Sequence, residues 1–118
     1  MKLQGVHHVS LNVRDVEEAL RFYIEALGLE EIPRPAFPFP GAWLRSGGQE
    51  IHLIRQEDHR APEGQHFAFR VDDVDAAAAA LSARGVKVGG PMDVPGAGRQ
   101  AFLRDPSGNL IELNQPKD

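Results

Sequence analysis

The sequence decides its fold in residues 8–17, HVSLNVRDVE, because a similar pattern returns at residues 66–75 as HFAFRVDDVD. His, Val, Asp and Val recur at the same places in both stretches. A second match follows in the same order, with GQEIHL at residues 48–53 and GNLIEL at residues 108–113. The chain is therefore predicted to contain two copies of one module, each beginning and ending with a strand.

Each copy is predicted to contain one helix directly after its first strand. Asp15 is a suitable N-cap, and Glu17 and Glu18 follow it in the first turn, where the helix dipole favours acids. Apolar residues then recur at helical spacing, and Gly28 is the expected stop: Val16, Ala19, Leu20, Tyr23, Ile24 and Leu27. In the second copy Asp73 caps a helix over residues 74–83, which Gly85 ends.

Short strands account for most of the remaining residues. They are predicted at residues 29–32, 42–46, 86–89 and 100–103, so each copy has the order β-α-β-β-β. A Pro-rich segment at residues 34–41 and a Pro/Gly segment at residues 93–98 are predicted to be loops. The expected fold is α+β, with two tandem βαβββ modules forming a curved mixed-sheet cup with the helices on the outside.

Bulk properties restrict the class of protein. The 118 residues are 42% hydrophobic and 25% charged, which suits one domain over residues 1–118 with modules at about residues 5–56 and 65–115. The net charge of −4 argues against nucleic acid as a partner. The absence of cysteine excludes disulfides, thiolate metal sites and a cysteine nucleophile. No apolar run is long enough to span a membrane, and the N-terminus lacks a signal-peptide core, so a soluble cytoplasmic protein is expected.

Strand alternation places four polar residues on one face of the predicted sheets. In the first strands of the two copies, the apolar residues must face the helices, so His8 and His66 point away from them. In the last strands, the same argument places His52 and Glu112 on that far face. His7 is assigned to the helix side, and His59 lies in the polar linker between the copies.

This set of side chains predicts a metal site. A lone histidine in a strand is most often a surface or core residue, but the four residues occupy repeat-matched positions on the same face. Three imidazoles and a carboxylate suit one borderline divalent ion such as Zn, Ni, Fe(II), Co or Mn. We therefore predict His8, His52, His66 and Glu112 as metal ligands.

The residues that carry this pattern also resemble a known family. HHVSLNVRDVEEALRFYIEALGLE at residues 7–30 is similar to the opening of the vicinal oxygen chelate superfamily, and LRDPSGNLIELNQ at residues 103–115 is similar to its closing strand pair. The resemblance covers nearly the whole chain and implies the βαβββ module. The superfamily includes glyoxalase I, methylmalonyl-CoA epimerase, extradiol dioxygenases, and fosfomycin and bleomycin resistance proteins.

The resemblance also implies roles for the four residues. His8, His66 and Glu112 fall on positions where the family has metal ligands. His52 falls where glyoxalase I usually has a second glutamate and the epimerase a glutamine, so this chain departs from both. In glyoxalase I a metal holds two substrate oxygens while a glutamate moves a proton between neighbouring carbons. Here Glu112 is expected to be a ligand and the catalytic base, while His52 is either a ligand or a proton shuttle.

Several functions stay open at this point. The first is a glyoxalase-type lyase or isomerase acting on a small molecule, such as lactoylglutathione lyase. The second is an Fe(II)-dependent extradiol-type dioxygenase with His8, His66 and Glu112 as a facial triad. The third is a fosfomycin or bleomycin resistance or binding protein; a phosphonate pocket would have only Arg70 and Arg99 as cations. A homodimer is expected, and the metal site is completed either within one chain or between two swapped chains.

Overall fold

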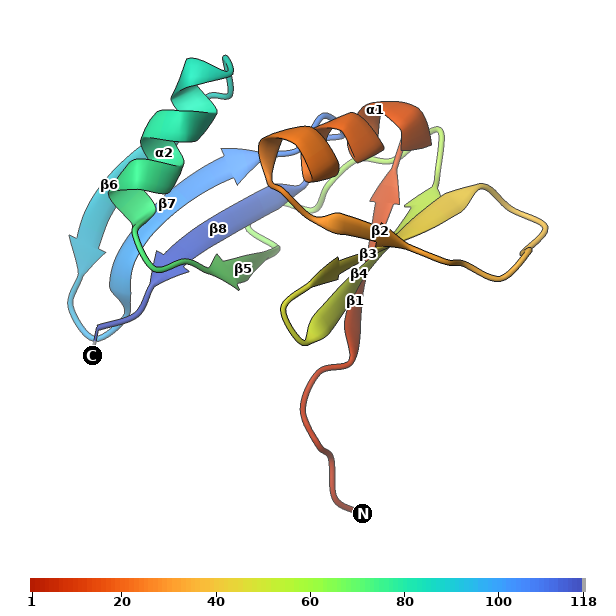
Figure 1. Ribbon diagram of the computed structural model, residues 1–118, viewed down its shortest axis with the longest axis horizontal. Helices are drawn as coiled ribbons and strands as arrows, with labels where there is room; N and C mark the ends of the chain where they lie inside the picture. Colours follow the sequence, from red (N-terminus) through yellow and green to blue (C-terminus); the bar gives the residue numbers. More distant parts are fainter. Residues whose placement is uncertain (118) are drawn as a thin grey trace. The chain divides into compact units, whose positions relative to one another are not determined.

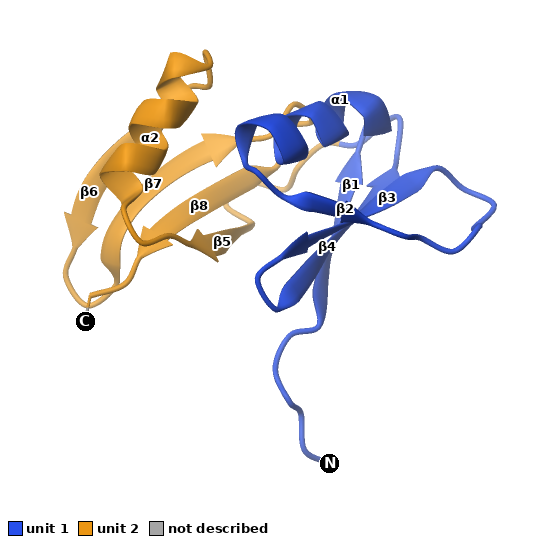
Figure 2. Cartoon of the chain, in the orientation of Figure 1, with its two compact units in different colours: residues 1–59 blue, residues 60–118 orange. Residues whose placement is uncertain are grey.

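The computed structural model describes residues 1–117, which form two compact units, residues 1–59 and the residues from 60 onward (Figure 2). Each unit contains helical segments and a four-stranded mixed sheet (Figure 1). The predicted α+β class and the two βαβββ modules are therefore confirmed.

The elements of unit 1 follow the predicted order. They are β1 (His8–Val13), α1 (Val16–Leu20), η1 (Arg21–Ala26), β2 (Glu30–Ile32), β3 (Gly41–Ser46) and β4 (Gln49–Arg55). The strands are arranged β1-β4-β3-β2, with β1 parallel to β4 and the other neighbours antiparallel. The strand that opens the unit therefore lies beside the strand that closes it.

Unit 2 repeats this arrangement. Its elements are β5 (His66–Arg70), α2 (Val74–Ala83), β6 (Gly89–Val94), β7 (Gly98–Arg104) and β8 (Leu110–Gln115). The strands are arranged β5-β8-β7-β6, with β5 parallel to β8 and the other neighbours antiparallel. The internal repeat of the sequence thus appears as the same topology in both units.

The caps of both helices are those that the sequence predicts. The Asp15 carboxylate accepts a hydrogen bond from the Glu18 amide at 3.0 Å, and Asp73 accepts one from Ala76 at 3.0 Å. Gly28 follows the first helical segment with φ of 77°, a conformation that glycine adopts without strain. The described residues contain no helix that is long and apolar enough to cross a bilayer.

The first helix differs from the sequence prediction in its second half. A single α-helix was expected up to Leu27, but Arg21–Ala26 form a π-helix in which the Leu27 amide donates to the Phe22 carbonyl at 3.1 Å. The wider turn still buries Tyr23 completely. Apolar spacing marks the buried side of a helix, but it does not distinguish a π turn from an α turn over so few residues.

The prediction of a strand at residues 86–89 and a loop at 93–98 was wrong. The strand is β6, Gly89–Val94, and only residues 95–97 form the turn that joins it to β7. Pro91 is tolerated because β6 is the edge strand of its sheet, where an amide donor is not required on the open side. The pairing with β7 is irregular between Gly89 and Met92. Because of Pro91 and this irregularity, β6 lacks the alternation of apolar and polar residues by which a strand is recognised in sequence.

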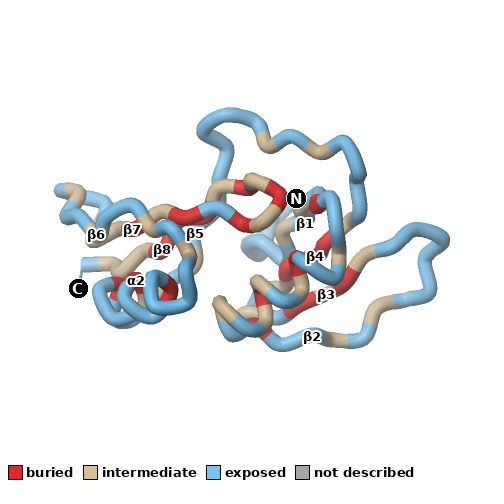
Figure 3. The backbone as a smooth tube through the Cα atoms, turned by 90° about the horizontal axis from the view of Figure 1, so that it is seen from above, coloured by how far each residue is buried: buried red, intermediate tan, exposed pale blue. Residues whose placement is uncertain are grey.

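The core of each unit lies between the sheet and its helix. Figure 3 shows buried residues concentrated in the central strands of each sheet. Unit 1 buries Ala42, Leu44, Ile51 and Leu53 there, and unit 2 buries the matching set Ala101, Leu103, Ile111 and Leu113. Because these residues face the helices, the other face of each sheet carries the polar side chains.

Candidate metal centre

The far face of the unit 1 sheet brings two predicted ligands together. In the parallel pairing of β1 with β4, Ser10 lies opposite His52 and His8 lies opposite Glu50, so all four side chains are on one face. The imidazoles of His8 and His52 stack with ring centroids 4.0 Å apart and an angle of 17°. His8 is exposed, whereas His52 is only 7% exposed. The predicted orientation of both residues is confirmed within this unit.

The ring of His52 is held on three sides. His8 covers one face, and the indole of Trp43 covers the other at a centroid distance of 4.2 Å and an angle of 5°. Trp43 occupies this place because it lies directly opposite His52 in the pairing of β3 with β4. The His52 Nε2 atom lies 2.9 Å from the Oε1 atom of Glu50. The imidazole of His52 is therefore enclosed by two rings and by one carboxylate of the same unit.

Glu50 is a site residue that the sequence argument did not select. It is two residues before His52 on β4, so alternation already placed both side chains on the same face. Its counterpart in the second copy is Leu110, so the repeat does not mark this position. The hydrogen bond from His52 lowers the pKa of Glu50, the nearby His7 and Arg45 also lower it, and partial desolvation opposes them. Glu50 is thus a charged carboxylate beside two predicted ligands.

His7 also differs from its prediction. It was assigned to the helix side by strand alternation, but β1 begins only at His8. The Nδ1 atom of His7 lies 3.0 Å from Nδ1 of His8, and the two rings meet edge to face at 5.2 Å. Alternation does not apply to a residue that precedes the strand, and His7 therefore joins the exposed end of the His8 and His52 stack.

Unit 2 brings the other two predicted ligands together. The Nε2 atom of His66 lies 3.1 Å from Oε1 of Glu112, and the side chain of Glu112 is 10% exposed. The Oε2 atom of Glu112 accepts a hydrogen bond from the Asn114 amide at 2.8 Å. The Nδ1 atom of His66 lies 2.9 Å from the carbonyl oxygen of Gly64. His66 and Glu112 therefore each use their second polar atom for a hydrogen bond to a further residue of the same unit.

The contact in unit 2 fits a cation. A carbonyl oxygen only accepts hydrogen bonds, so Nδ1 of His66 carries a proton, and the lone pair of the neutral ring is on Nε2. That lone pair then faces a carboxylate oxygen, and the contact needs a proton or a metal ion between the two atoms. Imidazole nitrogen and carboxylate oxygen are also the donors that borderline divalent ions prefer. The residues present therefore fit the metal that the family implies.

Each unit supplies two of the four predicted ligands. Within residues 1–117, no three His, Asp or Glu side chains form a cluster that could hold a metal ion. The complete set of His8, His52, His66 and Glu112 stays a prediction, with Glu50 as a further carboxylate next to it.

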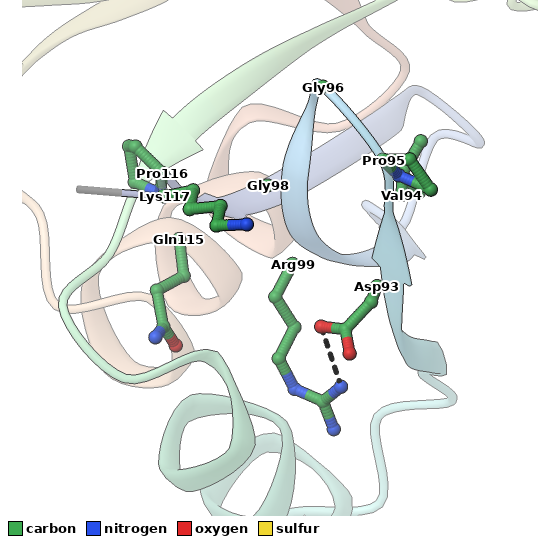
Figure 4. A pocket seen from close by; sticks show the side chains of 9 residues that line it. All are labelled: Asp93, Val94, Pro95, Gly96, Gly98, Arg99, Gln115, Pro116 and Lys117. Atoms are coloured by element: carbon green, nitrogen blue, oxygen red, sulfur yellow. Dashed lines mark hydrogen bonds and ion pairs between the residues drawn. The ribbon is translucent and has the colours of Figure 1, made fainter.

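Unit 2 also contains a pocket that is lined by ion-paired side chains rather than by the predicted ligands. It lies beside the β6–β7 turn and the end of β8, and Arg99, Asp93, Gln115 and Lys117 are among its lining residues (Figure 4). Arg99 binds Asp75 of α2 through two hydrogen bonds of 2.8 Å and binds Asp93 at 3.2 Å. These bonds raise the pKa of Arg99 and lower that of Asp75.

The ion pairs correct one expectation from the sequence. Arg99 was considered as a cation for a phosphonate pocket, but its charge is already compensated by two carboxylates. The Val74 amide, at the start of α2, donates to the Gln115 side chain at 2.9 Å, so this end of the helix is also satisfied. Arg99 is therefore not a free cation in this pocket.

An aromatic surface adjoins the stack in unit 1. Phe37 and Phe39, in the loop before β3, are each 42% exposed and stack at 5.3 Å. The Arg34 guanidinium lies about 5 Å from both rings and donates to the Phe39 carbonyl at 2.9 Å. Phe37 also lies 6.2 Å from Trp43. Aromatic rings thus extend from the loop to His52 and His8.

Comparisons with known proteins agree with the fold. The sequence profile of the Glyoxalase/Bleomycin resistance protein/Dioxygenase superfamily matches residues 5–113. A Vibrio parahaemolyticus protein named as a lactoylglutathione lyase is 31% identical over 93% of this chain and 89% of its own length. The crystal structure of a glyoxalase family protein from Bacillus anthracis superposes with a TM-score of 0.90 and 32% identity, covering 99% of this chain and 98% of that one.

A further solved structure has a different stated role. An antibiotic binding protein from a Streptomyces species superposes with a TM-score of 0.82 and 35% identity, and the match covers 99% of both chains. Proteins of comparable similarity to this chain are therefore named both as enzymes and as binding proteins. The fold alone does not choose between these roles.

Proposed function

Because the chain belongs to the Glyoxalase/Bleomycin resistance protein/Dioxygenase superfamily, we propose that it is a metal-dependent enzyme of the lyase or isomerase type. Its substrate is a small molecule that presents two neighbouring oxygen atoms. The observation that carries the proposal is the contact between His66 Nε2 and Glu112 Oε1, two possible metal-binding atoms that lie 3.1 Å apart. The other ring nitrogen of His66 contacts the Gly64 carbonyl, and the other oxygen of Glu112 accepts from Asn114. The similarity to a lactoylglutathione lyase supports the reaction type.

The proposed ligands are His8, His52, His66 and Glu112. A bound divalent ion, such as Zn, Ni, Fe(II), Co or Mn, would orient the two oxygens and stabilise negative charge that develops on them. Glu112 is also the proposed base, because its carboxylate is mostly buried and Asn114 keeps it oriented. Because a bound ion lies near the plane of each imidazole that holds it, the nearly parallel rings of His8 and His52 cannot both bind one ion in the observed arrangement, and the exposed His8 ring would have to turn.

Metal binding is the first test of this proposal. Metal-free protein is titrated with Zn, Ni, Co and Mn by isothermal calorimetry, and we expect one ion per site. His66→Ala should reduce the affinity strongly, whereas His59→Ala removes an imidazole outside both sheets and should have no effect. Absence of binding by the unchanged protein for every ion would refute the proposal.

Proton transfer is the second test. The hemithioacetal of methylglyoxal and glutathione serves as a probe substrate, and exchange of its α-proton with deuterated solvent is followed by NMR. We expect Glu112→Gln to abolish exchange, because the amide cannot accept the proton. Continued exchange in this variant would show that Glu112 is not the base.

Two other functions remain as alternatives, and each predicts a distinct outcome in an assay of its own. Oxygen uptake with Fe(II) and catechol would indicate a dioxygenase that uses His8, His66 and Glu112 as a facial triad. Tight binding of an antibiotic without turnover would indicate a binding protein, as the similarity to the Streptomyces protein favours.

We also propose a homodimer, to be measured by light scattering after size-exclusion chromatography. Chains that carry His8→Ala can be mixed with chains that carry Glu112→Ala. Intact sites form in the mixture only if unit 1 of one chain combines with unit 2 of another. Recovery of metal binding on mixing would therefore identify a shared site.

A further inference from the structure

We propose that Glu50 is a positioning residue that holds His52 through Nε2 and so leaves Nδ1 as the nitrogen with which His52 binds the metal. The inference rests on the proposed function, because it assigns a role toward the same metal. It concerns the position at which this chain departs most from glyoxalase I, where the resemblance implies a glutamate.

The geometry of His52 leaves one atom free. Both faces of the ring are covered, by His8 and by Trp43, with ring centroids 4.0 Å and 4.2 Å from that of His52. Its Nε2 atom is engaged by Glu50 at 2.9 Å. No fully buried side-chain nitrogen or oxygen lacks a partner within residues 1–117. Because the hydrogen bond to Glu50 is the one found for this ring, Nδ1 lies at an accessible edge of the stack.

Chemistry decides which nitrogen carries the proton. An ionised carboxylate only accepts hydrogen bonds, so the proton lies on Nε2 of His52. The lone pair of the neutral ring is then on Nδ1, which is the atom able to bind a cation. Histidines that bind metals usually donate their other N–H to a carboxylate or a carbonyl in this way.

The same arrangement is present in unit 2 with the nitrogens exchanged. Gly64 holds Nδ1 of His66 through its carbonyl oxygen at 2.9 Å, which leaves Nε2 for Glu112 and the metal. In unit 1 the holding group is a side chain on β4, and the free atom is Nδ1. Each unit therefore contains one predicted histidine ligand with one ring nitrogen on a hydrogen-bond acceptor of the same unit, which leaves the other ring nitrogen for the metal.

The direct test uses metal-free protein labelled with 15N in its histidines. Long-range 1H–15N correlation spectra distinguish a protonated ring nitrogen from one with a free lone pair. At a pH where the ring is neutral, we expect His52 to be protonated at Nε2 in the unchanged protein and to lose this preference in Glu50→Ala. A ring protonated at Nδ1 in the unchanged protein would overturn the proposal, whether or not any metal binds.

Metal affinity separates a positioning residue from a ligand. Glu50→Gln keeps an oxygen that accepts from Nε2, so its affinity should stay within a few-fold of the unchanged protein. Glu50→Ala should weaken the affinity about 10–100-fold, as is typical when such a hydrogen bond is removed. If Glu50→Gln loses as much affinity as Glu50→Ala, Glu50 is itself a ligand, and the proposal is wrong.

The matched control is Glu31→Ala on β2. It removes the same charge from the same sheet, but Glu31 pairs with the core residue Leu44 and is therefore on the opposite face. Metal affinity should not change in this variant. An equal loss of affinity in Glu31→Ala and Glu50→Ala would mean that net charge causes the effect, and this would also refute the proposal.

Discussion

Replacement of Asp105 by Ala tests the turn that positions Glu112. Asp105 is 4% exposed, and its carboxylate accepts three hydrogen bonds of 2.9 Å, from the Ser107 amide and from the backbone and side-chain amides of Asn109. The turn joins β7 to β8, and it sets the register in which Phe102 lies opposite Glu112. Loss of the carboxylate removes the acceptor of these hydrogen bonds within a buried turn.

The magnitude follows from these contacts. A hydrogen bond to a charged group contributes about 1.5–3 kcal/mol, but three bonds to one carboxylate are not additive. We therefore expect Asp105→Ala to lower the free energy of unfolding by about 3–5 kcal/mol, compared with a total of about 6–18 kcal/mol for a chain of this length.

The assay is equilibrium unfolding in urea followed by far-ultraviolet circular dichroism. Asp105→Asn keeps one oxygen for the backbone donors but places an amide against the side-chain amide of Asn109, so an intermediate loss is expected. Asp72→Ala removes an exposed carboxylate after β5 and should change the free energy by less than about 0.5 kcal/mol. A loss below about 1 kcal/mol in Asp105→Ala would refute this account of the turn.

Three further predictions concern stability. Leu53→Ala, at a completely buried position of β4, should lower the free energy of unfolding by about 2–5 kcal/mol in the same urea assay. Asp73→Ala removes the N-cap of α2 and should cost about 1 kcal/mol, whereas Asp73→Asn should restore most of it. In the folded protein the pKa values of Glu50 and Asp75 lie below their ordinary values of 4.5 and 3.8. The two ionised carboxylates therefore stabilise the fold at a pH above these ordinary values, and this stabilisation is lost as the pH falls through the pKa values of the folded protein. The urea concentration at the unfolding midpoint, measured from pH 6 to pH 2, should therefore fall less in Glu50→Gln than in the unchanged protein. An equal fall in both proteins would contradict the stabilising role of the Glu50 carboxylate.

The directions of the candidate ligands could be predicted because the chain contains two copies of a half-buried strand pair. With the buried side fixed by Ile51 and Leu53, alternation determined the direction of His52, and the pairing of β4 with β1 confirms it. The same reasoning placed His66 and Glu112, and they are in contact. Periodicity works where one face is buried, since a shift by one residue would expose the core.

Other features depend on information that the pattern does not carry. The contact of His7 with His8 depends on where β1 begins, and strand ends are poorly marked in sequence. The role of Glu50 depends on a side-chain contact rather than on a repeated residue. The strand β6 was missed because Pro91 and an irregular register remove its alternation. These are local geometric effects, and tertiary packing decides each of them.

The stack of Trp43 on His52 gives the protein an optical reporter of its own site. Trp43 is the only tryptophan in the chain, so all indole fluorescence comes from a ring 4.2 Å from the proposed ligand. A positive charge on the stacked imidazole, from a proton or a bound cation, withdraws electron density next to the excited indole and changes its emission. Occupancy of the site can therefore be followed at micromolar concentration in unlabelled protein, without knowledge of the substrate.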